Sequence, residues 1–263
     1  MIPVKPKKGL GQHFLTDKNI ARKIVNCLTW QHYNKILEIG PGMGILTELL
    51  LEFPEKEMRF VEIDRSSVAY LADRFPAIHH RIIAADILDL PFEAIYNEPF
   101  AIIGNFPYNI SSQLFFKILK YRDLVPETVC MIQKEVAVRL ASPPGSKNYG
   151  ILSVLLQAFF DIEFLFTVAP TVFVPPPRVN SAVIRLKRNQ TSALDCNEEL
   201  FTRVVKTAFN QRRKTLRNSL KSITTNRETA ESIWQQRPEQ LCIDDFIWLT
   251  RWIGQNGDPA GKS

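Results

Sequence analysis

The sequence predicts an α/β protein with an open, mostly parallel sheet, followed by a small all-helical domain. Three observations lead to this prediction. Between residues 35 and 186, short apolar runs alternate with amphipathic segments, which is typical of strand–helix units in a parallel sheet. Four of these runs end in a glycine-rich turn or in a polar residue. After residue 190 no strand pattern is visible, and apolar residues recur at helical spacing.

Each predicted element follows from a local pattern. Thr16 or Asp17 can cap a first helix that runs to about Leu28. The predicted strands cover residues 35–39, 58–64, 81–86, 100–103, 128–132, 160–168 and 181–186. The predicted helices cover residues 45–51, 111–121, 136–140, 150–159 and about 244–253, and a further helix holds Phe201 to Phe209. A polar stretch at 185–192 places a domain boundary near residue 190, which gives domains 1–190 and 191–263.

The first strand runs into a glycine-rich turn. Gly40, Gly42 and Gly44 stand at alternate positions, where glycine lets the backbone pass close to a ligand. Their spacing is G-x-G-x-G, whereas dinucleotide sites use G-x-G-x-x-G. Glu38, just before the turn, suits a ligand that carries an amine better than one that carries phosphates.

Two further strand ends carry acids. Glu62, 22 residues beyond Gly40, is placed to accept both hydroxyls of a ribose, and Asp86 can accept from an adenine amine. Each acid taken singly could equally cap the following helix. Acids at three successive strand ends, on the edge where open parallel sheets bind ligands, favour a nucleoside-bearing cofactor.

The fourth strand ends in the turn Asn105-Phe106-Pro107-Tyr108. Pro107 fixes its own backbone angle and pushes Phe106 away from the helical region, so the turn holds one shape. Asn105 offers an amide and Tyr108 a flat ring, the pair that a planar base with an exocyclic amine needs. Phe173, at the start of a proline-rich loop, could complete an aromatic clamp, and a simple anchoring role is the alternative.

The composition limits the classes of protein to which this chain can belong. A net charge of +6 permits a nucleic-acid partner, and 45% apolar with 23% charged residues is ordinary for a soluble globular protein. No run approaches the roughly 18 apolar residues of a membrane span, and no signal peptide is visible. The four cysteines are far apart and lack a histidine cluster, so we expect reduced thiols, a cytoplasmic location and no metal site.

Two basic segments are candidates for contacts with phosphates. Lys7 and Lys8 precede a glycine-rich stretch that could be an arm folded over a bound ligand, although on composition alone a solvated tail with one hydrophobic anchor is the simpler interpretation. Residues 201–221 contain seven lysines or arginines and no acid, which indicates an anionic partner. The residues that we assign to RNA binding are Lys7, Lys8, Arg178, Arg212, Arg213, Lys214 and Arg217.

Taken together, the motifs are similar to those of a known family. They are Gly11–Leu15, Glu38–Gly44, Val61–Asp64, Asp86, Asn105–Tyr108, Phe173–Ser181 and Ala208–Leu216. In this order and spacing the chain resembles the ribosomal RNA adenine dimethyltransferases of the KsgA type, whose relatives include the erythromycin-resistance methylases. The resemblance covers nearly the whole length, and the last motif favours the ribosome-biogenesis branch.

The resemblance implies a class I methyltransferase domain with a seven-stranded sheet that binds S-adenosylmethionine, and a helical RNA-binding domain. The cofactor-binding residues are then His13, Leu15, Glu38, Gly40, Gly42, Glu62, Asp86 and Asn105. It further implies a monomer that acts on small-subunit (16S) ribosomal RNA in the pre-30S particle. Two positions depart from the family, since His13 stands where Asn is common and Phe106 where Leu is commoner.

The implied reaction is transfer of the sulfonium methyl to N6 of adenine, performed twice. Asn105 and a backbone carbonyl of the turn stiffened by Pro107 would accept the N6 hydrogens, while Tyr108 and Phe173 would hold the flipped base. Two other functions stay open: a DNA adenine-N6 methyltransferase, for which no target-recognition domain is evident, and a non-catalytic ribosome assembly factor. A nicotinamide dehydrogenase is disfavoured by the glycine spacing and by the Asn105 turn.

Overall fold

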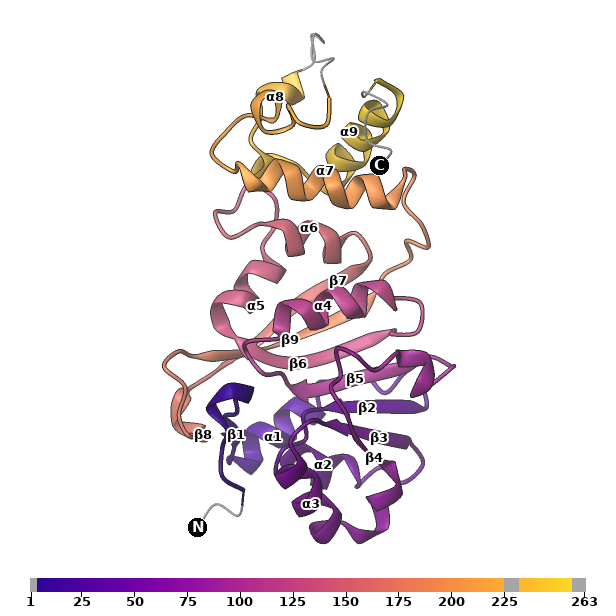
Figure 1. Cartoon of the computed structure of the whole chain (residues 1–263), viewed down its shortest axis with the longest axis vertical. Helices are drawn as coiled ribbons and strands as arrows, with labels where there is room; N and C mark the ends of the chain where they lie inside the picture. Colours follow the sequence, from indigo (N-terminus) through magenta and orange to yellow (C-terminus); the bar gives the residue numbers. More distant parts are fainter. Residues whose placement is uncertain (1–3, 225–231, 257–263) are drawn as a thin grey trace. The chain divides into compact units, whose positions relative to one another are not determined.

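The computed structural model describes residues 4–224 and 232–256 (Figure 1). The chain divides into two compact units: the first comprises Met1–Ala137 and Asp161–Arg188, and the second comprises Val138–Phe160 and Asn189–Ser263. The change of unit after Arg188 lies close to the boundary that the sequence predicts near residue 190. Residues 138–160 belong to the helical unit, whereas the sequence pattern places them in the first domain.

The first unit is built around a seven-stranded sheet with the order β4-β3-β2-β5-β6-β9-β7 (Figure 1). The strands from β4 to β6 are parallel to one another, and β9 runs antiparallel to β6. Their bounds are β2 Lys35–Ile39, β3 Glu57–Glu62, β4 Ile82–Ala84, β5 Phe100–Asn105, β6 Glu127–Gln133, β7 Phe160–Val168 and β9 Ser181–Arg188. The α/β prediction is confirmed. The strand order reverses between β2 and β5, and open sheets bind ligands beyond the carboxyl ends at such a point.

One helix precedes the parallel strands of this unit, and others connect them. They are α1 Lys18–Val25, α2 Ile45–Leu50, α3 Arg65–Arg74 and α4 Ser111–Lys120, and α5 Lys134–Ala141 leads out of the unit. Asp17 is the cap of α1, because its side chain accepts the backbone N–H groups of Asn19 and Ile20 at 2.8 and 3.0 Å. The strand predicted at residues 81–86 is shorter in the structure, where β4 spans Ile82–Ala84 and a 3₁₀ segment from Pro76 to Arg81 precedes it.

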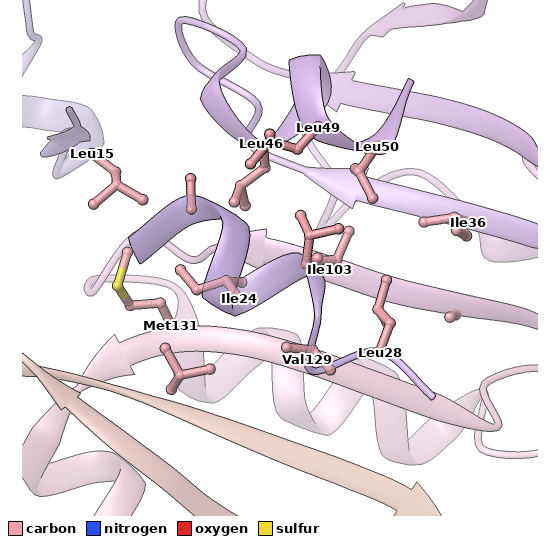
Figure 2. Packing of buried hydrophobic residues seen from close by; sticks show 14 of the residues in the cluster. Leu15, Ile24, Leu28, Ile36, Leu46, Leu49, Leu50, Ile103, Val129 and Met131 are labelled. Carbon is pink, nitrogen blue, oxygen red and sulfur yellow. The ribbon is translucent and has the colours of Figure 1, made fainter. Parts of the chain in front are cut away.

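One hydrophobic core of the first unit lies between the sheet and the helices α1 and α2. Figure 2 shows Ile24, together with Leu28 from the turn after α1, close to Ile103 and Val129 of the central strands. All four side chains are at most 3% exposed. This core holds β2, β5 and β6 in place, and these strands carry the polar residues of the site at their ends.

A two-stranded sheet joins the N-terminal segment to the proline-rich loop. β1 Phe14–Leu15 pairs antiparallel with β8 Phe173–Val174, and Leu15 lies opposite Phe173. Thr16 adds two hydrogen bonds, since its backbone N–H and its hydroxyl both donate to the carbonyl of Val172, at 2.9 and 3.0 Å. Residues 14–16 are therefore part of an anchored arm, and the attachment is more extensive than the single hydrophobic anchor that the composition suggested.

The second unit is helical. Its helices are α6 Ile151–Gln157, α7 Glu198–Asn210, α8 Leu216–Ser219 and α9 Ile243–Asn256. The apolar face predicted for α7 is buried as expected, and it consists of Phe201, Val204, Val205, Ala208 and Phe209. Phe209 stacks on Phe246 of α9 with a centroid distance of 6.0 Å. Because α6 packs against α7, residues 138–160 belong with this unit.

Within residues 4–224 and 232–256, no helix is long and apolar enough to cross a membrane. The same residues contain no group of three or more His, Cys, Asp or Glu side chains that could hold a metal ion. All four cysteines carry unpaired thiols, and burial raises the pKa of the Cys130 thiol well above its usual range.

Candidate active site

Three adjoining cavities of the first unit lie at the carboxyl ends of the strands. The glycine cavity is lined by residues 40–43 of the glycine-rich turn and by Glu62. The Asp86 cavity shares Glu62 with it and extends past β4. The proline-loop cavity shares Tyr108 with the glycine cavity and is walled by residues 174–179. The residues predicted for cofactor binding and for catalysis thus gather around connected spaces, with the exceptions given below.

The glycine-rich turn is packed against the N-terminal arm. Gly40 and Gly42 adopt positive φ angles of 67° and 57°, a region that favours glycine. A Cβ atom on Gly42 would lie 2.9 Å from the ring of Phe14, so any side chain there would push β1 away. Leu15, the other residue of β1, is 4% exposed and lines the glycine cavity. The arm and the turn therefore form one wall of the cavity.

Glu62 is a buried acid between the glycine cavity and the Asp86 cavity. Its side chain is 4% exposed, and each carboxylate oxygen accepts one backbone N–H: that of Gly42 at 3.0 Å and that of Asp64 at 2.9 Å. Burial raises the pKa of Glu62, and these two hydrogen bonds oppose the shift. Each oxygen keeps a second lone pair, which can accept a ligand hydroxyl.

Glu38 is more deeply buried and lines the glycine cavity. It is 1% exposed, and its carboxyl accepts a hydrogen bond from the hydroxyl of Thr47 at 2.6 Å. Burial, together with the nearby charge of Glu62, raises the pKa of Glu38 to about 8, although the Thr47 hydroxyl lowers it. A cationic group bound beside Glu38 would favour its ionised form and so lower this raised pKa.

The raised pKa of Glu38 predicts a pH-dependent loss of stability. Between the ordinary value of 4.5 and about 8, the unfolded chain releases this proton while the folded protein keeps it. The free energy of unfolding should therefore fall across this window relative to Glu38→Gln, by up to about 1.4 kcal/mol per pH unit, and stay level above it. Denaturant titrations at pH 5, 6.5 and 8 measure the difference. The exposed Glu55→Gln is the control, and equal slopes in wild type and Glu38→Gln would contradict the assignment.

Asp86 lies in a loop that Lys117 holds. The carboxylate of Asp86 accepts the backbone N–H of Leu88 at 2.8 Å. The ammonium group of Lys117 donates to the carbonyls of Ile87, Leu88 and Leu90, at 2.5, 3.1 and 2.5 Å. Burial lowers the pKa of this lysine. Sequence reasoning did not single out Lys117, and a basic residue on a helix gives no local signal of such a contact.

Asn105 ends β5 and is tied to the arm. Its Nδ2 donates to the backbone carbonyl of His13 at 2.9 Å, which directs its Oδ1 elsewhere. Among the residues that the structure describes, no hydrogen-bond partner meets Oδ1, and Asn105 lines the glycine cavity. The imidazole Nδ1 of His13 lies 2.7 Å from the carbonyl of Pro175, an acceptor, so Nδ1 is the donor. His13 thus joins the arm, Asn105 and the proline-rich loop.

Tyr108 stands between the glycine cavity and the proline-loop cavity, with its ring half-buried. The ring stacks on His13 with a centroid distance of 5.5 Å, and the hydroxyl lies 2.6 Å from that of Ser181. Burial raises the pKa of Tyr108. Phe106 points the other way: it is 1% exposed and packs on Phe115 of α4. The turn therefore presents one aromatic ring to the cavities and buries the other.

Phe173 does not line these cavities. Its ring is 2% exposed and belongs to the core that contains Leu15 and Val168. The reason is the pairing of β8 with β1, which turns this side chain toward the core. In this structure Phe173 acts as the anchor of the proline-rich loop, the alternative that the sequence left open, and of the predicted pair only Tyr108 lines the cavities.

The predicted RNA-binding residues fall into two groups. Lys8 and Arg178 are exposed and line the proline-loop cavity, and Arg213 and Lys214 are exposed on the second unit. The other three have partners within the chain. Lys7 forms an ion pair with Asp64. Arg212 lies 3.8 Å from Glu239 and donates a hydrogen bond to the carbonyl of Ser146 at 3.3 Å. Arg217 also interacts with another group of the protein. These three are weaker candidates for phosphate contacts than the sequence suggested.

Asp64 is a further residue whose contact sequence reasoning missed. Its side chain is fully buried at the start of α3 and accepts from Lys7 and from Gln12, the latter at 3.3 Å. Burial works to raise the pKa of Asp64, but these hydrogen bonds outweigh it and the pKa lies below its usual range. The arm is thereby clamped over the glycine cavity. Lys7 and Gln12 lie more than 50 residues from Asp64 in the sequence, so no local pattern indicates these contacts.

The parallel sheet, the glycine-rich turn and the acids at the strand ends define a class I S-adenosylmethionine-dependent methyltransferase fold. Solved structures agree. A dimethyladenosine transferase from Plasmodium falciparum superposes with a TM-score of 0.77 and 23% identity, covering 92% of this chain and 98% of that one. The 23S rRNA methyltransferase ErmE superposes with a TM-score of 0.66 and 24% identity, covering 90% and 99%. At these identities the likeness shows the fold.

Sequence relatives identify the family. A model of the ribosomal RNA adenine dimethylase family matches residues 4–240. Proteins named ribosomal RNA small subunit methyltransferase A are 53% identical over 253 residues in Phocaeicola vulgatus and 52% identical over 259 residues in Flavobacterium johnsoniae. These alignments cover 95% and 98% of this chain, and 90% and 99% of the relatives. The chain belongs to the ribosomal RNA adenine dimethylase family.

Proposed function

We propose that this protein transfers methyl groups from S-adenosylmethionine to N6 of adenines in small-subunit ribosomal RNA and gives N6,N6-dimethyladenosine. The observation that carries the proposal is Asn105, which lines the glycine cavity and whose Oδ1 has no hydrogen-bond partner among the described residues, while Tyr108, three residues on, also lines the proline-loop cavity. An amide acceptor and an aromatic ring at the junction of two cavities suit an exocyclic amine brought to a cofactor. Family membership supports the same activity.

The residues of the glycine cavity and the Asp86 cavity fit the cofactor. Glu62 has lone pairs left for the ribose hydroxyls, and Asp86 lines the neighbouring cavity, where it can accept from the adenine amine. Glu38 and the glycine-rich turn surround the remaining space, which suits a cationic amino acid moiety. When bound, S-adenosylmethionine supplies the electrophilic methyl group. Leu15 and His13, from the arm, close the same cavity.

Asn105 contributes to transfer by favouring the reactive form of the amine. The lone pair of adenine N6 is delocalised into the ring, so the free base is a poor nucleophile. The Oδ1 of Asn105 accepts an N6 hydrogen and favours a pyramidal nitrogen whose lone pair points at the methyl group. This hydrogen bond strengthens as positive charge builds on N6, which is where it lowers the barrier. The bond from Nδ2 to His13 keeps the amide in the required orientation.

Tyr108 holds the flipped base against this amide. One such stack contributes roughly 1–3 kcal/mol. The short contact between its hydroxyl and that of Ser181 fixes the ring, so little freedom is lost when a base binds. Lys8 and Arg178 are exposed and line the proline-loop cavity, which supports a role for them in contacts with phosphates near the flipped nucleotide.

Mass spectrometry of nucleic acids tests the proposal directly. Small-subunit RNA, total RNA and DNA are digested from cells with and without this protein. We expect N6,N6-dimethyladenosine to disappear from small-subunit RNA alone when the protein is removed. Loss of N6-methyladenosine from DNA would instead favour a DNA methyltransferase, and unchanged modification with a defect in subunit assembly would favour a non-catalytic assembly factor.

Replacing Lys117 should weaken cofactor binding without affecting the chemical step. Lys117→Met removes the three hydrogen bonds that shape the loop around Asp86, and we expect affinity for S-adenosylmethionine to fall about tenfold. Calorimetry measures the affinity, and single-turnover transfer at saturating cofactor should stay near the wild-type rate. Lys120→Met, on the same helix, is the matched control. Wild-type affinity in Lys117→Met would show that the loop holds its shape without this lysine.

A further inference from the structure

Gln133 is a polar residue at the end of β6 with no role in the function described so far. It lines the proline-loop cavity together with Tyr108 and His13, and it is half-buried. Within residues 4–224 and 232–256, no hydrogen-bond partner meets its side-chain amide. An amide at the carboxyl end of a strand, facing a cavity that suits a base, repeats on β6 the arrangement that Asn105 makes on β5.

The sheet fixes the position of Gln133 relative to the turn. Asn105 pairs with Met131 across β5 and β6, so Gln133 lies two residues beyond that pair, on the same face of the strand as Met131. On the other side, Gln133 pairs with Ser181 of β9. Ser181 is the residue whose hydroxyl meets that of Tyr108 at 2.6 Å. Ser181 is therefore a neighbour of both Gln133 and Tyr108.

Resting on the function proposed above, we propose that Gln133 donates a hydrogen bond to a ring nitrogen of the flipped adenine, N1 or N7, and so keeps the base in place through both methyl transfers. The two ring nitrogens flank the exocyclic amine and accept only. The amide NH₂ of glutamine supplies the donor that such a nitrogen requires.

Double methylation gives this contact a particular use. The first transfer replaces one N6 hydrogen by a methyl group, and the second leaves no N6 hydrogen at all. Contacts to N6, including that from Asn105, therefore weaken as the reaction advances, whereas N1 and N7 do not change. A donor aimed at a ring nitrogen retains the monomethylated base in the cavity until the second methyl group is transferred.

The experiment uses the full-length protein with small-subunit particles whose target adenosine is replaced by 1-deazaadenosine or by 7-deazaadenosine. Wild type, Gln133→Ala and Gln133→Glu are compared in single-turnover assays, and mass spectrometry separates monomethyl from dimethyl product. Glutamate keeps the shape of the side chain but lacks the donor. Gln113→Glu, an exposed glutamine on α4, is the matched control, and calorimetry with S-adenosylmethionine and thermal melting check cofactor binding and folding.

On adenosine, we expect both Gln133 variants to slow the second transfer about tenfold and to accumulate monomethyladenosine, with unchanged cofactor affinity. One deaza analogue should slow the wild type by a similar factor and should not slow Gln133→Ala further, which identifies the ring nitrogen. Additive losses with both analogues, or a normal dimethyl product from Gln133→Glu, would overturn the proposal. Absence of any methylation by wild type on unmodified particles would instead refute the proposed function, so the two failures are distinct.

Discussion

Asn105→Ala is expected to lower the single-turnover rate of methyl transfer about 100- to 1,000-fold, the usual effect of removing one group that stabilises charge in a transition state. The loss arises because the N6 amine no longer meets the Oδ1 acceptor as positive charge develops on it. The substitution also leaves the carbonyl of His13 without its partner, so cofactor affinity should fall as well, by a smaller factor.

Separate measurements divide the two effects. Calorimetry gives the affinity for S-adenosylmethionine, and rapid-quench assays on small-subunit particles at saturating cofactor give the rate of transfer. Asn26→Ala, an exposed position just after α1, is the control. A transfer rate within a few-fold of wild type in Asn105→Ala would mean that another group accepts the N6 hydrogens, and the role assigned to Asn105 would be wrong.

Phe173→Ala should destabilise the protein by about 3–5 kcal/mol, as expected for removing a fully buried phenylalanine. Phe173 lies opposite Leu15 in the pairing of β1 with β8, so the cavity left behind should also loosen the arm. The arm carries Phe14 against Gly42, and cofactor affinity should therefore fall together with stability.

Equilibrium unfolding in guanidinium chloride measures the effect. Phe164→Ala on β7 is the matched control, because that ring is 37% exposed and its removal should cost far less. A fully stable Phe173→Ala protein that binds cofactor normally but fails to methylate would support the aromatic-clamp role that the sequence suggested for this ring.

Features that depend on residues close in sequence could be predicted. Apolar runs that end in polar residues gave the parallel strands, and the structure brings Glu38, Glu62, Asp86 and Asn105 to one edge of the sheet. This follows because parallel strands all end at the same edge, whatever their order. Gln133 obeys the same rule, although the sequence pattern ended that strand at residue 132 and did not single out the residue after it.

Features that depend on distant partners could not be predicted. β1 and β8 are two residues each, too short for any periodic pattern, yet their pairing decides that Phe173 is buried. A lysine in a basic segment looks available for phosphate until the buried carboxylate of Asp64 is placed beside Lys7. The sequence also did not predict that residues 138–160 belong to the helical unit. They belong there because α6 packs against α7, which is distant from it in the chain.

On the function proposed above, the contacts of His13 make the binding of cofactor and RNA interdependent. This residue holds Asn105 through its carbonyl, the proline-rich loop through its ring nitrogen and Tyr108 through stacking, and it lines both the glycine cavity and the proline-loop cavity. A ligand that shifts His13 in one cavity reshapes the other. Reciprocity then requires that RNA changes the affinity for cofactor by the same factor by which cofactor changes the affinity for RNA. Product release would be subject to the same constraint, because His13 lines both the cavity proposed for the cofactor and the cavity proposed for the base.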